Sequence, residues 1–106
     1  MMFRTFGDRS GEVVALNGRG EAFLADGHRD AREPHAIALD LASQTDNGYE
    51  QARAHHGLAQ AYQSVGQPGQ ARHHWQQALA EFTRLGTPEA DQIRAQLAET
   101  QADGRP

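Results

Sequence analysis

A repeat of 39 to 40 residues is the feature that most restricts what this chain can fold into. The stretch "NGRGEAFLADG" matches the later stretch "HHGLAQAYQSVG", and four residue pairs lie 39 positions apart: Gly18 and Gly57, Ala22 and Ala61, Phe23 and Tyr62, Gly27 and Gly66. Beyond the last glycine the step is 40, which pairs Ala31, Ala38 and Leu39 with Ala71, Ala78 and Leu79. The beginning of a third copy, called the third start, follows, and Leu97 occupies there the position that Leu58 has in the second copy. Self-similarity at a period of about 20 to 50 residues is typical of repeat proteins.

Each repeat has the pattern of two helices joined by a tight turn. Residues 48–66 carry small or apolar side chains at helical spacing, namely Ala54, Leu58, Ala61, Tyr62 and Val65. Gly66 supplies the left-handed residue that ends a helix, and Pro68 suits the first turn of the next one. That next helix has a predicted buried stripe of Ala71, Trp75, Ala78, Leu79 and Phe82, and Gly86 ends it.

Two further helix starts complete the prediction. Asp30 followed by Glu33 is a capping-box pattern in the first repeat, and Thr87 followed by Pro88 opens the last helix. We therefore expect an all-α fold of antiparallel helix hairpins with about five helices. The expected segments are residues 1–9 as the remnant of a preceding helix or a disordered N-terminus, 10–47 as a degenerate first repeat, 48–86 as the second repeat, 87–102 as a C-terminal capping helix and 103–106 as a disordered tail.

Composition excludes several classes of protein. The 106 residues fit one domain, and 38% hydrophobic with 23% charged residues is typical of a folded protein outside the membrane. Cysteine is absent, which excludes disulfides, thiolate zinc sites and a cysteine nucleophile and suits a reducing cytoplasm. A net charge of −4 argues against direct binding of nucleic acid. We expect a cytoplasmic protein that contacts neither nucleic acid nor membrane.

The spacing of the second repeat resembles the tetratricopeptide repeat (TPR). Six residues stand at that family's signature separations: Leu58, Ala59, Tyr62, Ala71, Trp75 and Ala78. The first repeat supplies Leu16, Gly20, Phe23, Ala31 and Ala38. It departs from the signature at Arg19, where the family has Leu, and at His35, where it has an aromatic residue. The resemblance implies a TPR-like α-solenoid with a degenerate first copy.

Longer stretches, including "YEQARAHHGLAQAY" and "QARHHWQQALAEFTRLGTPEADQIRAQL", look like the C-terminal repeat arrays of actinobacterial antibiotic regulatory proteins. This resemblance implies a sensing or scaffolding array. It does not carry over DNA-binding or nucleotide-binding parts, because no winged-helix stretch and no GxxxxGK[ST] loop is present. The opening "MFRTFGDRS" resembles the tail of a preceding second helix, so we expect the chain to begin partway through an array.

In TPR proteins the first helices of successive repeats line a concave face that binds a peptide or a partner. The resemblance places these residues there: Val14, Asn17, Glu21 and Leu24 from the first repeat, Arg53, His56, Gln60 and Gln63 from the second, and Gln92 and Glu99 from the third start. Asn17, Arg53 and His56 are predicted to hold a carboxylate or backbone amides. The family's paired-lysine clamp for a C-terminal carboxylate is absent. The alternative is that these are ordinary solvated residues of a stacking helix.

The histidine pairs His55–His56 and His73–His74 do not have the spacing of a metal site. Adjacent residues on a helix point about 100° apart, so neither pair can chelate an ion as residues four apart can. One member of each pair can still meet the other across the two helices of the repeat. A zinc or nickel site would need a third ligand, which the sequence does not identify. Ordinary surface or groove histidines are the favoured interpretation.

The main hypothesis is a module that binds a protein or peptide within a bacterial transcriptional regulatory or signalling protein. A structural alternative is self-association, in which Val13 and Leu16 lack a preceding repeat and the N-terminal end stacks on another copy. A weaker alternative is a metal or pH sensor built on the histidines. No nucleophile elbow, HExxH motif or phosphate-binding loop is present, so we expect no enzyme activity and no cofactor.

Overall fold

The computed structural model describes residues 6–27 and 29–103 and contains five α-helices. They are α1 (Phe6–Ala25), α2 (Arg32–Gln44), α3 (Gly48–Ser64), α4 (Pro68–Leu85) and α5 (Glu89–Asp103), with a short 3₁₀ helix, η1 (Arg29–Ala31), before α2. No strand occurs in these two ranges. The prediction of an all-α fold with five helices is confirmed.

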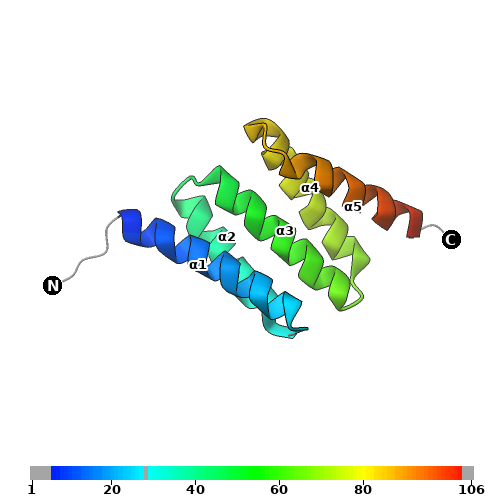
Figure 1. Ribbon diagram of the computed structural model, residues 1–106, viewed down its shortest axis with the longest axis horizontal. Helices are drawn as coiled ribbons and strands as arrows, with labels where there is room; N and C mark the ends of the chain where they lie inside the picture. Colours follow the sequence, from blue (N-terminus) through cyan, green and yellow to red (C-terminus); the bar gives the residue numbers. More distant parts are fainter. Residues whose placement is uncertain (1–5, 28, 104–106) are drawn as a thin grey trace.

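The helices form successive antiparallel pairs (Figure 1). Each helix packs on the next one in the chain, and α1 also packs directly on α3. The turns between them are short, so neighbours in the sequence are neighbours in space. Helix α3 therefore lies against α1, α2 and α4 and is the central element of the fold.

The turn residues behave largely as the sequence indicates. Gly66 and Gly86 adopt positive φ angles of 77° and 71° at the ends of α3 and α4, and Pro68 is in the first turn of α4. Asn47 caps α3, where its side chain accepts a hydrogen bond from the backbone N–H of Glu50 at 3.2 Å. The capping box predicted from Asp30 is wrong. Asp30 lies within η1, and α2 begins after Ala31 without a side-chain cap.

Helix boundaries differ from the expected segments at the N-terminal end. Helix α1 begins at Phe6, so residues 6–9 continue into the first repeat instead of forming a separate remnant. Residues 1–5 and 104–106 lie outside the described residues. Val65, which stands at helical spacing in the sequence, is 43% exposed because it follows the last residue of α3.

The larger core cluster lies between α3, α4 and α5. Trp75, Phe82 and Ile93 are at most 1% exposed and are its largest members. Small residues surround them and let the helices approach closely: Ala52, Ala59, Ala71, Ala78 and Ala90. The predicted stripe of α4 is confirmed, with Leu79 partly buried against the cluster.

A smaller cluster joins α1, α2 and α3 through Val13, Ala38, Ala42 and Ala54. Val13 is fully buried there and Leu16 packs against its edge. The expectation that these two residues face an absent preceding repeat is therefore wrong for Val13. The alanines contribute little apolar area, so hydrophobic burial stabilises this half of the fold less than the other half.

Replacing Trp75 with Ala tests the larger cluster. Because the indole is fully buried, we expect the free energy of unfolding to fall by about 3–5 kcal/mol, measured by urea denaturation followed by circular dichroism. Trp75→Phe keeps an aromatic ring and is expected to cost less. A loss below about 1 kcal/mol for Trp75→Ala would contradict the assigned burial.

Candidate functional site

A polar cluster lies at the junction of α1, α2 and α3, centred on His35. The His35 ring is 1% exposed and lies beside two helix glycines, Gly20 of α1 and Gly57 of α3. A Cβ added at either glycine would fall well inside van der Waals distance of the ring. The absence of a side chain at both positions is thus what gives the imidazole its space.

Hydrogen bonds extend from His35 to the surface. His35 Nδ1 lies 2.8 Å from Asn17 Oδ1. The Asn17 amide donates to the Glu50 carboxylate at 2.8 Å and to the Glu50 backbone carbonyl at 3.2 Å. Glu50 Oε1 also accepts from Arg53 Nη1 at 3.2 Å. Arg53 then crosses to α1, where Nε and Nη2 donate to the two oxygens of Glu21 at 2.8 and 2.9 Å.

This chain of contacts fixes the protonation of His35. Since Asn17 Oδ1 is an acceptor, His35 must donate from Nδ1, and a neutral ring then carries its lone pair on Nε2. Burial lowers the pKa of His35 from 6.5 to about 4, although the Glu21 carboxylate opposes this shift. His35 Nε2 is buried and has no hydrogen-bond partner among the described residues. The ring is therefore neutral at pH 7.

The ion pair between Arg53 and Glu21 holds α3 to α1. The Arg53 guanidinium lowers the pKa of Glu21, and Glu21 raises the pKa of Arg53. The contact is bidentate, and the side chains are 23% and 47% exposed. A two-pronged pair of this kind orients both partners more firmly than a single surface salt bridge.

Two of the predicted binding residues have other roles. Asn17 is fully buried, so the prediction that it faces a partner is wrong. Its side-chain amide forms hydrogen bonds with His35 and Glu50 instead. Arg53 has its Nε, Nη1 and Nη2 groups engaged by Glu21 and Glu50. The geometry therefore does not support the predicted site in which Asn17, Arg53 and His56 together hold a carboxylate.

The other predicted binding residues remain accessible to different degrees. Glu21, Gln63, Gln92 and Glu99 are exposed, whereas His56 and Gln60 are partly buried. The His56 ring packs on Trp75 with centroids 5.2 Å apart, and burial lowers its pKa. His56 thus contributes to the packing between α3 and α4 as well as to the surface.

Glu50 was not among the site residues predicted from the sequence. Its place three residues after the Asn47 cap is a normal position for an acid in a first helical turn. Nothing local in the sequence indicates that its side chain is 7% exposed or meets α1. The available signal is the pair of mid-helix glycines, Gly20 and Gly57, because a glycine inside a helix often marks a close approach.

A second group of aromatic and cationic side chains links α2, α3 and α4. Nδ1 of His55 and Nδ1 of His74 lie 2.9 Å apart across α3 and α4. Tyr62 stacks on His74 with centroids 5.5 Å apart and planes 4° apart, and the Arg32 guanidinium lies 5.2 Å from the Tyr62 ring centre. One member of each histidine pair does meet the other across the repeat, as the sequence analysis allowed.

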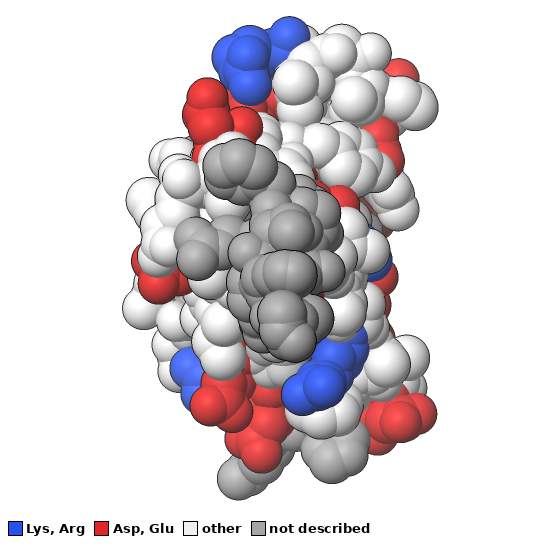
Figure 2. Space-filling view, turned by 90° about the vertical axis from the view of Figure 1, so that its left-hand side faces the viewer, with Lys and Arg blue, Asp and Glu red and all other residues white. Residues whose placement is uncertain are grey.

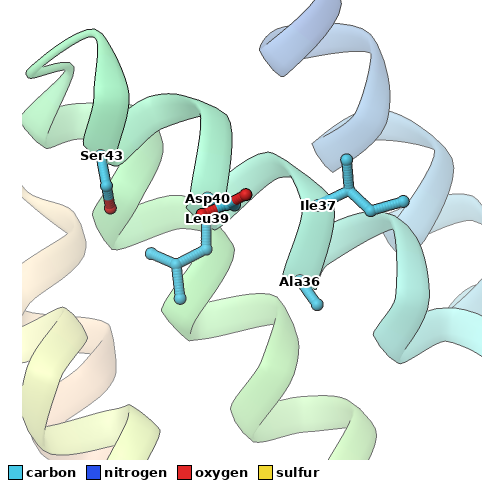
Figure 3. A pocket seen from close by; sticks show the side chains of 5 residues that line it. All are labelled: Ala36, Ile37, Leu39, Asp40 and Ser43. Carbon is cyan, nitrogen blue, oxygen red and sulfur yellow. The ribbon is translucent and has the colours of Figure 1, made fainter.

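Two openings on the surface involve side chains of α2. A shallow opening of about 580 Å³ lies on α2 and is lined by Ala36, Ile37, Leu39, Asp40 and Ser43 (Figure 3). Its polar side chains are the carboxylate of Asp40 and the hydroxyl of Ser43. A second opening shares Ala36 and reaches Leu58 and Tyr62 of α3.

Two features of the described ranges concern metal ions and membranes. Within residues 6–27 and 29–103, no group of three or more His, Cys, Asp or Glu side chains converges as a metal cage would. In the same part of the chain, no helix has the length and apolar character needed to cross a membrane.

Comparison of the chain with protein-family models, with curated proteins and with solved structures gave no match.

Substituting Gly57 tests the contact with His35. Alanine favours a helix over glycine by about 1 kcal/mol, yet its Cβ would collide with the imidazole. We expect Gly57→Ala to destabilise the protein by about 1–3 kcal/mol, measured by urea denaturation. The matched control is Gly11→Ala in α1, where an added Cβ meets nothing within 4 Å. That variant is expected to be neutral or stabilised, and equal effects of the two would contradict the contact.

Acid sensitivity tests the neutral state of His35. Its pKa is about 4 in the folded chain and about 6.5 in the unfolded chain, so below pH 6.5 the unfolded state binds more protons. Stability is therefore full above pH 6.5 and falls as the pH drops toward 4, by about 3 kcal/mol from this residue. The free energy of unfolding, measured by urea denaturation at several pH values, should depend more steeply on pH in the wild type than in His35→Gln. Identical slopes would contradict a buried neutral His35.

Proposed function

We propose that this chain is a TPR-like module that binds a protein or peptide segment along the side formed by α1 and α3. The observation that carries the proposal is the Arg53–Glu21 ion pair, which joins the first helices of the two repeats. These helices also pack directly on each other. A surface built on two helices held in this way is preorganised, and preorganisation lowers the entropic cost of binding.

The accessible side chains favour a partner that offers backbone amides over one that offers a charged terminus. Gln60 is partly buried and Gln63 is exposed, and each amide can donate and accept hydrogen bonds. Val14 of α1 is 46% exposed and provides an apolar contact on the neighbouring helix. Arg53 is engaged by Glu21 and Glu50 and so has little capacity left for a ligand carboxylate.

The proposed setting is a cytoplasmic regulatory or signalling protein of a bacterium. The support for it is the resemblance of the repeat stretches to the arrays of actinobacterial antibiotic regulatory proteins. Repeat modules are reused for many partners, so this setting is a weaker inference than the binding role. The proposed role needs no catalytic group.

Self-association is the second candidate, favoured by exposed apolar side chains on the first hairpin. Val14 of α1 and Ile37 of α2 are 46% and 45% exposed. Figure 2 views the molecule from the side on which α1 begins, and on its described surface acidic and basic side chains are interspersed among neutral ones. Because Val13 is buried within the chain, this end offers less apolar area to a second copy than the sequence indicates.

A pair of substitutions on α3 tests the binding role. Gln60→Glu/Gln63→Glu would place two charges on the proposed surface, and Gln76→Glu/Gln77→Glu places the same charges on exposed positions of α4. Affinity capture from a bacterial lysate, quantified by mass spectrometry, should recover a partner with the wild type and the α4 variant. We expect at least about tenfold less of it with the α3 variant.

Two results of that capture experiment would contradict the proposal. Equal recovery of the partner by all three proteins would show that the partner does not bind at the α1–α3 side. Recovery of the chain itself as the sole protein would favour the self-association candidate. Circular dichroism of each variant provides the check that the helices are intact.

A further inference from the structure

His55 and His74 form a pair of facing imidazoles that the binding role does not use. They come from α3 and α4, which pack directly on each other, and their Nδ1 atoms are 2.9 Å apart. We propose that the two Nδ1 atoms bind one divalent transition-metal ion of the Cu²⁺ or Ni²⁺ type, with water in the remaining coordination positions.

The distance between the two nitrogens suits this geometry. Imidazole nitrogens bind such ions at about 2.0–2.1 Å. Two ligands at that distance and 90° apart on the ion are separated by about 2.9 Å, and tetrahedral ligands by about 3.3 Å. The observed 2.9 Å matches the cis arrangement of square-planar or octahedral ions. Binding an ion in this arrangement therefore requires no change in the separation of the two nitrogens.

The protonation states also suit metal binding. Burial lowers the pKa of His55 from 6.5 to about 4 and lowers the pKa of His74. Two neutral rings that share one Nδ1–H···Nδ1 hydrogen bond place one proton between them. When an ion binds, the donor ring carries its proton on Nε2 instead, so both Nδ1 lone pairs are available without loss of a proton to solvent.

Neighbouring side chains pack against the His74 ring. Tyr62 stacks in parallel on His74, and His73 packs against His74 with planes 71° apart and centroids 5.2 Å apart. The charged groups nearby are Arg32, which lies against Tyr62, and Glu81, whose carboxylate favours a positive charge at His55. Packing of this kind restrains the orientation of ligating histidines as second-shell contacts do.

The number of protein ligands selects the class of ion. Because no third His, Cys, Asp or Glu joins the pair among the described residues, a closed tetrahedral zinc site is not formed. Two nitrogens completed by water oxygens suit the tetragonal preference of Cu²⁺ and Ni²⁺, and Cu²⁺ binds such sites most tightly of the first-row divalent ions.

The test is titration of the untagged protein with Cu²⁺ at neutral pH, by isothermal titration calorimetry and by electron paramagnetic resonance of the complex. We expect one ion per chain and a spectrum with two equatorial nitrogens. His55→Gln and His74→Gln should each weaken binding at least about tenfold. The matched control is His56→Gln, which removes the ring next to His55 on α3 that packs on Trp75 instead and should change the affinity less than about threefold.

Several outcomes would overturn the proposal. These are the absence of saturable binding at one equivalent, unchanged affinity in His74→Gln, or an equal loss in His56→Gln, which would place the ion elsewhere. If a variant unfolds, nuclear magnetic resonance of the wild type decides instead. Cu²⁺ should broaden the ring signals of His55 and His74 before those of His35 and His56, and the reverse order would overturn the proposal.

Discussion

The close contact of His35 with Gly20 and Gly57 is the constraint on which the N-terminal half of the molecule depends. It sets how near α2 lies to α1 and α3, because a side chain at either glycine would occupy the space of the ring. Once the ring is buried, its Nδ1–H needs an acceptor, and Asn17 supplies one. Asn17 in turn orients Glu50, and Glu50 contacts Arg53, which reaches Glu21 on α1. The proposed binding surface is therefore held by a buried polar interaction.

Equivalent buried positions of the two repeats are occupied by side chains of different chemistry. His35 and Trp75 stand 40 residues apart and are both buried between helices. In the second repeat the partner ring is His56, which packs at a tilt on the indole of Trp75, and the indole belongs to a cluster with Phe82 and Ile93. In the first repeat the partner is Asn17, and the surrounding residues are mostly alanines. The first repeat thus relies more on hydrogen bonds, whereas the second relies more on apolar burial.

The fold was largely predictable because its signals are local. The repeat step, the glycines at helix ends and the stripe around Trp75 each depend on residues close together in the sequence. The site was less predictable because its partners are distant. Asn17 was expected to face a partner, because the TPR resemblance places it on the concave face. Its burial depends on contacts with His35 and Glu50, which belong to two other helices. The meeting of His55 with His74 was among the possibilities, but which ring of each pair faces inward depends on how α3 is rotated against α4.

The most direct measurement of the central claim is the ¹⁵N spectrum of the His35 ring across the range from pH 8 to about pH 5. The account predicts a neutral ring protonated at Nδ1 throughout the folded state, with that N–H slow to exchange because it is bonded to Asn17 inside the protein. A ring that titrates near pH 6.5 and exchanges rapidly would contradict it. In that case His35 would be solvated, and the glycines beside it would not be what sets the spacing of the three helices.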